Sequence, residues 1–127
     1  MSTKISLINC LENEKVYYGK FSRKDEKNYT IYEFGNKNHM FVWKIYDKGI
    51  IIDSISDVKV HLVLIKEKKT KGYIETEFGN IDLQCYTDIL KIENGSIEVR
   101  YSFVQEDEQI FHFCLKEELK WNPSTWN

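Results

Sequence analysis

The sequence predicts an all-β protein built as one closed or nearly closed antiparallel up-and-down β-barrel of about eight to ten strands, with a β-sandwich as the alternative. Three observations favour this class. The chain contains no Ala, whereas Ile, Val, Tyr and Phe abound, and these residues suit a pleated, half-buried surface. Apolar residues recur at every second position rather than with helical spacing. Nearly every link between the alternating segments is short and has turn chemistry.

The alternating segments are the predicted strands. They span Lys4–Leu11, Lys15–Ser22, Asn28–Phe34, His39–Tyr46, Gly49–Ser54, Val58–Lys66, Gly72–Phe78, Asn80–Ile92, Ser96–Gln105 and Gln109–Lys116. The breaks include "DKG" at Asp47–Gly49, "FGN" at Phe78–Asn80 and, most strongly, Asn94–Gly95. Because short links join antiparallel neighbours, the strands should form a meander, and a meander closes into a barrel without unpaired edges.

The Asn94–Gly95 turn also predicts a register. Both residues tolerate positive φ, as the central positions of a type I′ turn require. A two-residue loop then places Glu93 opposite Ser96 and Leu90 opposite Val99. One face of this hairpin holds Leu90, Ile92, Ile97, Val99, Tyr101 and Phe103, and the other holds Lys91, Glu98 and Arg100. Core and solvent sides are therefore cleanly separated.

The strand before this turn changes phase. Ile81, Leu83 and Cys85 are apolar at odd positions, whereas Leu90 and Ile92 are apolar at even positions. A regular strand cannot turn both sets to one face. We expect a β-bulge near Tyr86–Ile89, which adds one residue and bends the strand. The alternative is an interior that carries polar side chains able to bind a ligand, namely Asp82, Gln84 and Asp88.

Length and composition indicate one domain over residues 1–127, with an irregular C-terminal tail over residues 117–127. A net charge of −2 and a pI near 5.9 argue against nucleic acid as a partner. The basic run Lys66–Lys71 is expected to be a solvated hairpin loop. No apolar run has the length of a signal peptide or a membrane span. We therefore expect a cytoplasmic protein without membrane association, and nothing in the sequence indicates an oligomeric state. The three cysteines should be reduced: Cys10, Cys85 and Cys114.

The chain contains no nucleophile elbow, phosphate-binding loop or dinucleotide fingerprint. His39, His61 and His112 lack the short spacing of metal ligands, and so do the cysteines. We therefore expect no catalytic residues, no metal site and no cofactor. If the chain turns at Asp107–Glu108, His112 faces Phe103 and lies on the apolar face. The alternative role for this side chain is that of a hydrogen-bonded core or rim histidine.

Four segments, in order, carry a family pattern: "YTIYEFGN", "IIIDSISDVKVHLVL", "KTKGYIETEFGNIDLQCYTDILKI" and "GSIEVRYSF". The matching residues are Tyr32, Glu33, Tyr73, Thr76, Phe78, Gly79, Ile81, Thr87, Leu90, Ile97, Val99 and Tyr101. Over residues 16–115 the chain thereby resembles the YwiB-like proteins, small bacterial barrels grouped with the calycins alongside lipocalins and fatty-acid-binding proteins. The resemblance implies a lipocalin-like closed barrel and no established reaction or ligand, because the family is functionally uncharacterised.

The sequence departs from that family pattern at two places. An Arg-x-Gly is expected where Asp53, Ser54 and Ile55 stand, and a Pro is expected where Glu77 stands. If the arginine serves the family's cavity, this chain lacks it, and Arg100 is not an evident substitute.

Our first functional expectation is a binding barrel for a small, partly apolar or aromatic ligand. The candidate lining residues are Tyr101, Phe103 and His112, followed by Trp43 and Tyr86. Binding would rest on desolvation of an apolar group together with a few polar anchors. An eight-stranded barrel is wide enough to hold one small ligand, and Tyr and Trp side chains bring polar atoms that need partners.

Two alternatives belong to other classes of protein. In the first, the barrel is solid and the chain is a protein–protein interaction module, docking through an exposed strand or through the C-terminal tail. Trp121 and Trp126 of that tail would then be anchors, as aromatic hot spots often are. In the second, the chain is an enzyme with an unrecognised site.

Overall fold

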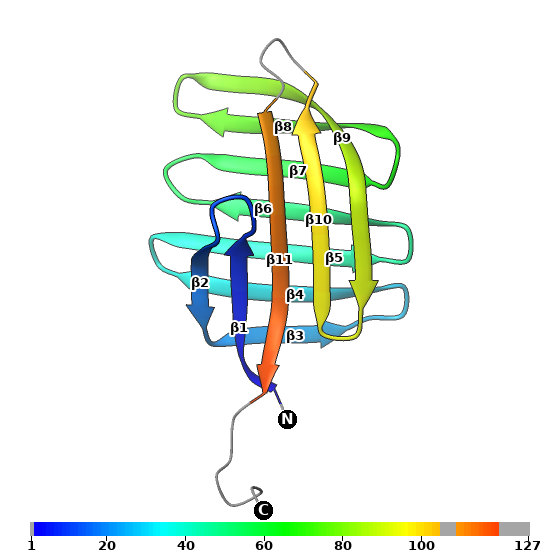
Figure 1. The fold of residues 1–127 in the computed structure, drawn as a ribbon. Helices are drawn as coiled ribbons and strands as arrows, with labels where there is room; N and C mark the ends of the chain where they lie inside the picture. The colour runs from blue at the N-terminus through cyan, green and yellow to red at the C-terminus, as the bar shows by residue number, and fades with distance from the viewer. Residues whose placement is uncertain (1, 105–108, 120–127) are drawn as a thin grey trace, which may run out of the picture.

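The structure, a computed structural model, describes residues 2–104 and 109–119, which form eleven strands in a nearly closed barrel (Figure 1). The all-β barrel prediction is thereby confirmed. The strands are β1 (Ser2–Asn9), β2 (Glu14–Gly19), β3 (Phe21–Asp25), β4 (Tyr29–Asn36), β5 (His39–Tyr46), β6 (Gly49–Ile55), β7 (Lys59–Ile65), β8 (Lys69–Thr76), β9 (Gly79–Glu93), β10 (Ser96–Phe103) and β11 (Gln109–Leu119). Within the described residues, no helix has the length and apolar character that crossing a membrane requires.

The strands form one antiparallel sheet with the order β2-β1-β11-β10-β9-β8-β7-β6-β5-β4-β3. In Figure 1, β1, β2, β10 and β11 run across β4 to β8, so the curled sheet makes two facing layers, and β9 bends from one layer into the other. The two edge strands, β2 and β3, are separated only by Lys20. The chain therefore passes from one edge of the barrel to the other at this point, which divides the predicted strand Lys15–Ser22 in two.

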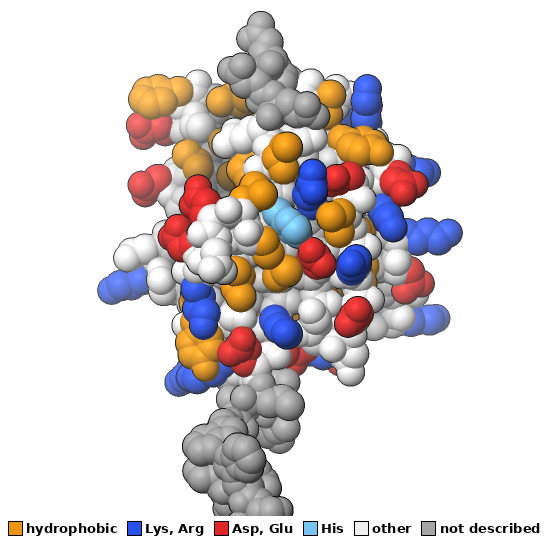
Figure 2. All heavy atoms as spheres, in the orientation of Figure 1, with side chains coloured by type: hydrophobic (Ala, Val, Ile, Leu, Met, Phe, Trp, Pro, Cys, Tyr) orange, Lys and Arg blue, Asp and Glu red, His pale blue; other side chains and the backbone are white. Residues whose placement is uncertain are grey.

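The core lies between the two layers and is filled by alternate side chains. In β5, Phe41, Trp43 and Ile45 are buried, whereas Val42 and Lys44 between them are more exposed. Burying each large apolar side chain contributes roughly 1.5–3 kcal/mol. The other buried apolar side chains are Ile5, Leu7, Tyr32, Phe34, Ile50, Ile52, Leu62, Leu64, Leu83, Cys85, Ile97, Val99, Tyr101 and Leu115. Figure 2 shows the outer face of the β1, β2, β10 and β11 layer, where charged side chains of both signs mix with hydrophobic ones.

The expected β-bulge in β9 is present. Arg100 of β10 pairs with Ile89, but the next residue, Tyr101, pairs with Thr87, so Asp88 is the extra residue. The phase reset turns Cys85 inward on one side of the bulge and Leu90 inward on the other. The alternative of a polar interior is wrong, because the polar side chains concerned are exposed: Asp82, Gln84 and Asp88.

The β9–β10 turn has the predicted register but a different turn geometry. Glu93 pairs with Ser96 and Leu90 pairs with Val99. Among the two central residues only Gly95 has positive φ, at 79°, so the turn is not the expected type I′. The loop predicted for the basic run Lys66–Lys71 is shorter in the structure, because β8 already begins at Lys69.

The irregular tail expected over residues 117–127 begins later than predicted. β11 continues to Leu119, because β1 pairs along it and Ile5 lies opposite Glu117. Glu117 and its neighbours therefore belong to the barrel. The rest of the predicted tail, which contains Trp121 and Trp126, lies outside the described residues.

Candidate ligand-binding cavity

An internal cavity of about 410 Å³ lies between the two layers of the barrel. Its aromatic lining consists of Phe41, Trp43, Tyr101, Phe103, Phe111 and Phe113. Its aliphatic lining consists of Leu7, Val16, Ile52, Val60, Leu62 and Ile74. Its remaining lining residues are polar: Asn9, His39 and Ser54. A concave, mostly apolar surface with a few polar groups is the usual composition of a small-molecule site.

Strand register gathers the aromatic rings on one side of this cavity. Tyr101 of β10 pairs with Phe111 of β11, and their ring centroids lie 5.1 Å apart in a stacked arrangement. Phe103 lies two residues further along β10, and its ring centroid is 4.8 Å from that of Phe111. Because side chains alternate along a strand, Phe111 and Phe113 both turn inward from β11. The apolar surface is therefore a direct product of period-2 patterning on two paired strands.

The three polar lining residues stand at or near strand ends. His39 is the first residue of β5 and Asn9 is the last of β1, while Ser54 is the second-last of β6. His39 Nε2 lies 2.6 Å from Ser54 Oγ, and the imidazole stacks on Phe41 with ring centroids 4.1 Å apart. Asn9 Oδ1 accepts hydrogen bonds from the backbone N–H groups of Leu11 and Glu12. The polar edge of the cavity is thus already ordered by the protein.

Two polar groups on the cavity lining have no hydrogen-bond partner among the described residues, and of these Trp43 Nε1 is a fully buried atom. Tyr101 is only 6% exposed, and no acceptor approaches its hydroxyl. Trp43 is 2% exposed, and its Nε1–H is likewise without an acceptor. Burial raises the pKa of the Tyr101 hydroxyl far above its ordinary value, with a smaller contribution from Cys85. The phenol therefore keeps its proton and remains a donor on the cavity lining.

Three of the five residues predicted to line the barrel do so: Tyr101, Phe103 and Trp43. His112 does not, because Phe103 pairs with Gln109 and the longer connection places His112 opposite Arg100 on the outer face. Its Nε2 lies 2.7 Å from Glu98 Oε2. The predicted turn at Asp107–Glu108 itself lies outside the described residues.

Tyr86 is the second residue that the structure places elsewhere. It pairs with Ser102, and its neighbours Cys85 and Thr87 are the fully buried, inward-facing residues of this part of β9. Alternation therefore turns the Tyr86 side chain to the outer face. The expectation that Tyr86 and His112 line the cavity is wrong for the same reason, since each is one residue out of phase.

Sequence reasoning missed the polar lining residues. His39 and Ser54 are fifteen positions apart in sequence and meet only because Phe41 pairs with Ser54 across β5 and β6. The alternation of apolar residues in β11 could have placed Phe111 and Phe113 in the cavity lining, but only with the correct register of the β10–β11 pair. Asp53 stands where the resemblance leads one to expect arginine. Its Oδ1 lies 2.6 Å from His61 Nδ1 on the outer face, so the side chain at this position does not line the cavity.

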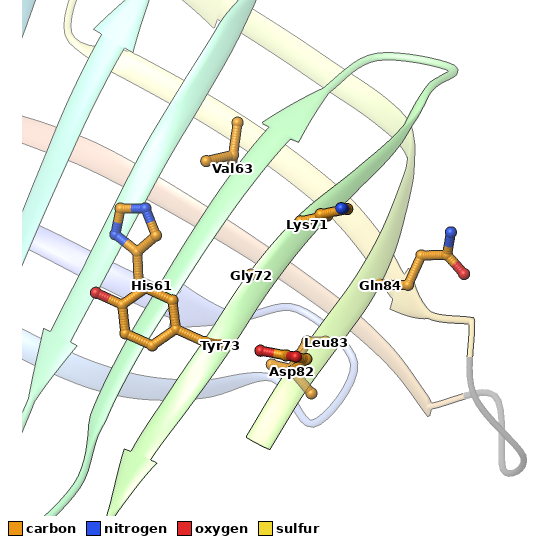
Figure 3. A pocket seen from close by; sticks show the side chains of 8 residues that line it. All are labelled: His61, Val63, Lys71, Gly72, Tyr73, Asp82, Leu83 and Gln84. Carbon is orange, nitrogen blue, oxygen red and sulfur yellow. The ribbon is translucent and has the colours of Figure 1, made fainter. Parts of the chain in front are cut away.

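A second depression, of about 680 Å³, lies on the outer face of β7, β8 and β9 (Figure 3). The His61 and Tyr73 rings stack there, with centroids 5.0 Å apart, while Lys71 and Gln84 project outward. This groove is larger than the cavity between the layers, but it is the more open of the two, and Lys71, Asp82 and Gln84 line it beside apolar side chains. We therefore regard the more apolar cavity between the layers as the stronger candidate site. Among the described residues, no group of three or more His, Cys, Asp or Glu side chains is arranged to hold a metal ion.

The up-and-down barrel and its apolar cavity define the class of the protein as a small calycin-like barrel. A family model described as "Domain of unknown function (DUF1934)" matches residues 7–116, and the chain belongs to this family. The crystal structure of the ywiB protein from Bacillus subtilis is similar, with a TM-score of 0.59 and 9% sequence identity over 91% of this chain and 88% of that one. This likeness concerns the fold alone. No curated protein matches the sequence.

Proposed function

We propose that the protein binds one small, partly apolar molecule inside its barrel. The observation that carries the proposal is the cavity of about 410 Å³, in which twelve of the fifteen described lining residues are aromatic or aliphatic. Transfer of an apolar ligand from water into such a space is favourable in proportion to the apolar area removed from water. The His39–Ser54 pair and the Tyr101 hydroxyl supply the polar contacts that orient a ligand.

The internal space supports binding over the alternative of a solid interaction module, because a solid barrel would leave no room between its layers. We propose no reaction. Ser54 and His39 do form a hydrogen-bonded hydroxyl–imidazole pair in the lining, but no described residue bonds the other ring nitrogen of His39, as the orienting group of a catalytic base would. The three free thiols support a reducing, cytoplasmic setting for this binding role.

A pair of matched substitutions on β7 tests the proposal. Val60→Phe places an aromatic ring in the cavity where the smaller valine side chain stands. Val63→Phe makes the same change on the outer face of the same strand. The probe is N-phenyl-1-naphthylamine, a neutral apolar dye whose fluorescence rises when it leaves water. We expect the wild type and Val63→Phe to bind the dye alike, and Val60→Phe to bind it at least about tenfold more weakly, a loss of about 1.4 kcal/mol.

Thermal unfolding of both variants supplies the folding control. Equal dye binding by Val60→Phe and Val63→Phe, with both variants folded, would show that the dye binds outside the barrel and would overturn the proposal. Native mass spectrometry of protein taken directly from cells provides a second test, because a retained ligand adds a discrete mass that Val60→Phe should lose.

A further inference from the structure

The chemistry of the cavity restricts the charge of its ligand. Among the lining residues that the structure describes there is no Lys, Arg, Asp or Glu. A carboxylate that enters an apolar space gives up hydration worth several kcal/mol, and only a cation or several hydrogen bonds can compensate it. Arg23 bonds Glu117 at 2.6 Å and does not line the cavity. An ammonium group would meet no anion either.

The hydrogen-bond donors of the cavity that have no partner indicate which polar group the ligand should carry. Tyr101 is 94% buried, its hydroxyl carries a proton at any physiological pH, and no described residue accepts that proton. An acceptor atom on a ligand in the cavity would give this hydroxyl a hydrogen-bond partner. The rings beside Tyr101 also favour an aromatic or other flat ligand body, since offset ring contacts add to the burial of apolar area.

We infer that the cavity selects an uncharged ligand with a flat apolar body and one oxygen acceptor, such as an aromatic ketone, which takes the hydrogen bond of Tyr101. This assignment rests on the proposed binding function and adds the chemical class of the ligand. The His39–Ser54 pair, at the strand ends, then contacts the outer part of the molecule. Free fatty acids and other carboxylates are disfavoured ligands.

Three probes with one ring system test this assignment: naphthalene, 2-acetonaphthone and 2-naphthoate. Their affinities are measured by isothermal titration calorimetry at about pH 8, where an ordinary histidine is neutral. We expect 2-acetonaphthone to bind about tenfold more tightly than naphthalene, as one recovered hydrogen bond allows. We expect 2-naphthoate to bind at least about tenfold more weakly than the ketone.

Tyr101→Phe removes only the hydroxyl and should reduce the affinity for 2-acetonaphthone to that for naphthalene, while leaving naphthalene binding unchanged. Tyr73→Phe, on the outer face, is the matched control and should behave as the wild type. Tighter binding of 2-naphthoate than of the ketone, or an unchanged ketone affinity in Tyr101→Phe, overturns the assignment. Failure of all three probes to bind the wild type is a different result, because it overturns the proposed binding function itself.

Discussion

The hydroxyl of Tyr32 on β4 donates a hydrogen bond of 2.6 Å to Oε2 of Glu117 on β11. The two strands belong to opposite layers, so this bond joins the layers directly (Figure 1). Arg23 Nη1 of β3 bonds the same carboxylate oxygen at 2.6 Å and also contacts Asn94 Oδ1 in the β9–β10 turn. The side chain of Glu117 is only 10% exposed, so its charge depends on these partners.

Glu117→Gln should therefore lower the free energy of unfolding by about 1–3 kcal/mol, because it removes the charge that Arg23 and Tyr32 satisfy. Tyr32→Phe removes one hydrogen bond and should cost about 1 kcal/mol. Urea unfolding measures both changes. Glu75→Gln, at an exposed position on β8, is the matched control and should lie within about 0.5 kcal/mol of the wild type. A Glu117→Gln variant as stable as that control would show that the cluster does not hold the layers together.

The bulge at Asp88 predicts a sharp difference between losing a side chain and losing a residue. Asp88→Ala removes only an exposed ion pair, in which Arg100 Nε lies 3.4 Å from Asp88 Oδ2, and should cost no more than about 1 kcal/mol. Deletion of Asp88 removes the phase reset, so Cys85 and Leu83 could no longer face inward together with Leu90. Circular dichroism and urea unfolding should show a folded Ala variant and an unfolded or severely destabilised deletion variant. Comparable stability of the two would mean that the bulge can be absorbed elsewhere.

Buried phenols predict a loss of stability at alkaline pH. Burial raises the pKa of both Tyr32 and Tyr101 well above the ordinary value, and Glu117 adds to the effect at Tyr32. Above about pH 10 the unfolded chain releases these protons while the folded chain retains them. The unfolded state then binds fewer protons, so the free energy of unfolding falls as pH rises through this range. Below about pH 10 the same groups contribute their full stabilisation.

Urea unfolding from about pH 9 to about pH 11 measures this slope, and Tyr32→Phe and Tyr101→Phe should each flatten it. Burial also raises the pKa of Cys85 to about 11 and that of Cys114 to about 12, so part of the slope, with the same sign, should remain when both phenols are removed. An equal slope in the wild type and in the double variant would contradict the assignment to these phenols.

The thiols of Cys10 and Cys114 lie 3.3 Å apart between the end of β1 and β11, and both are free. Diamide should oxidise this pair to a disulfide, with the two thiol hydrogens passing to the diamide as it is reduced. Burial, followed by the hydrogen bond with Cys10, raises the pKa of Cys114 to about 12. Because the thiolate is the reacting form, the reaction should accelerate as pH rises.

Peptide mapping under non-reducing conditions identifies the linked cysteines. The fully buried Cys85 should remain unmodified, and Cys114→Ser should abolish the cross-link. A disulfide that includes Cys85 would contradict the prediction, and so would a reaction rate that does not depend on pH.

The accuracy of the sequence-based predictions follows from the range of the interactions involved. The bulge near Tyr86–Ile89 was predictable, because the apolar phase changes within a single strand. The register across Asn94–Gly95 was predictable for the same local reason. His112 was misplaced because its facing depends on the length of a connection, and an error of one residue reverses every side chain on a strand.

The sequence by itself determined that this chain forms antiparallel strands joined by short turns, because period-2 alternation and turn residues act over a few neighbouring positions. It favoured a barrel and left a β-sandwich as the alternative. It also determined that Tyr101, Phe103 and Trp43 face the interior. Only the tertiary structure decided that the interior is partly empty and that His39 meets Ser54 at its edge. Those features depend on how two layers cross and how far apart they stay, and no local pattern of residues encodes that distance.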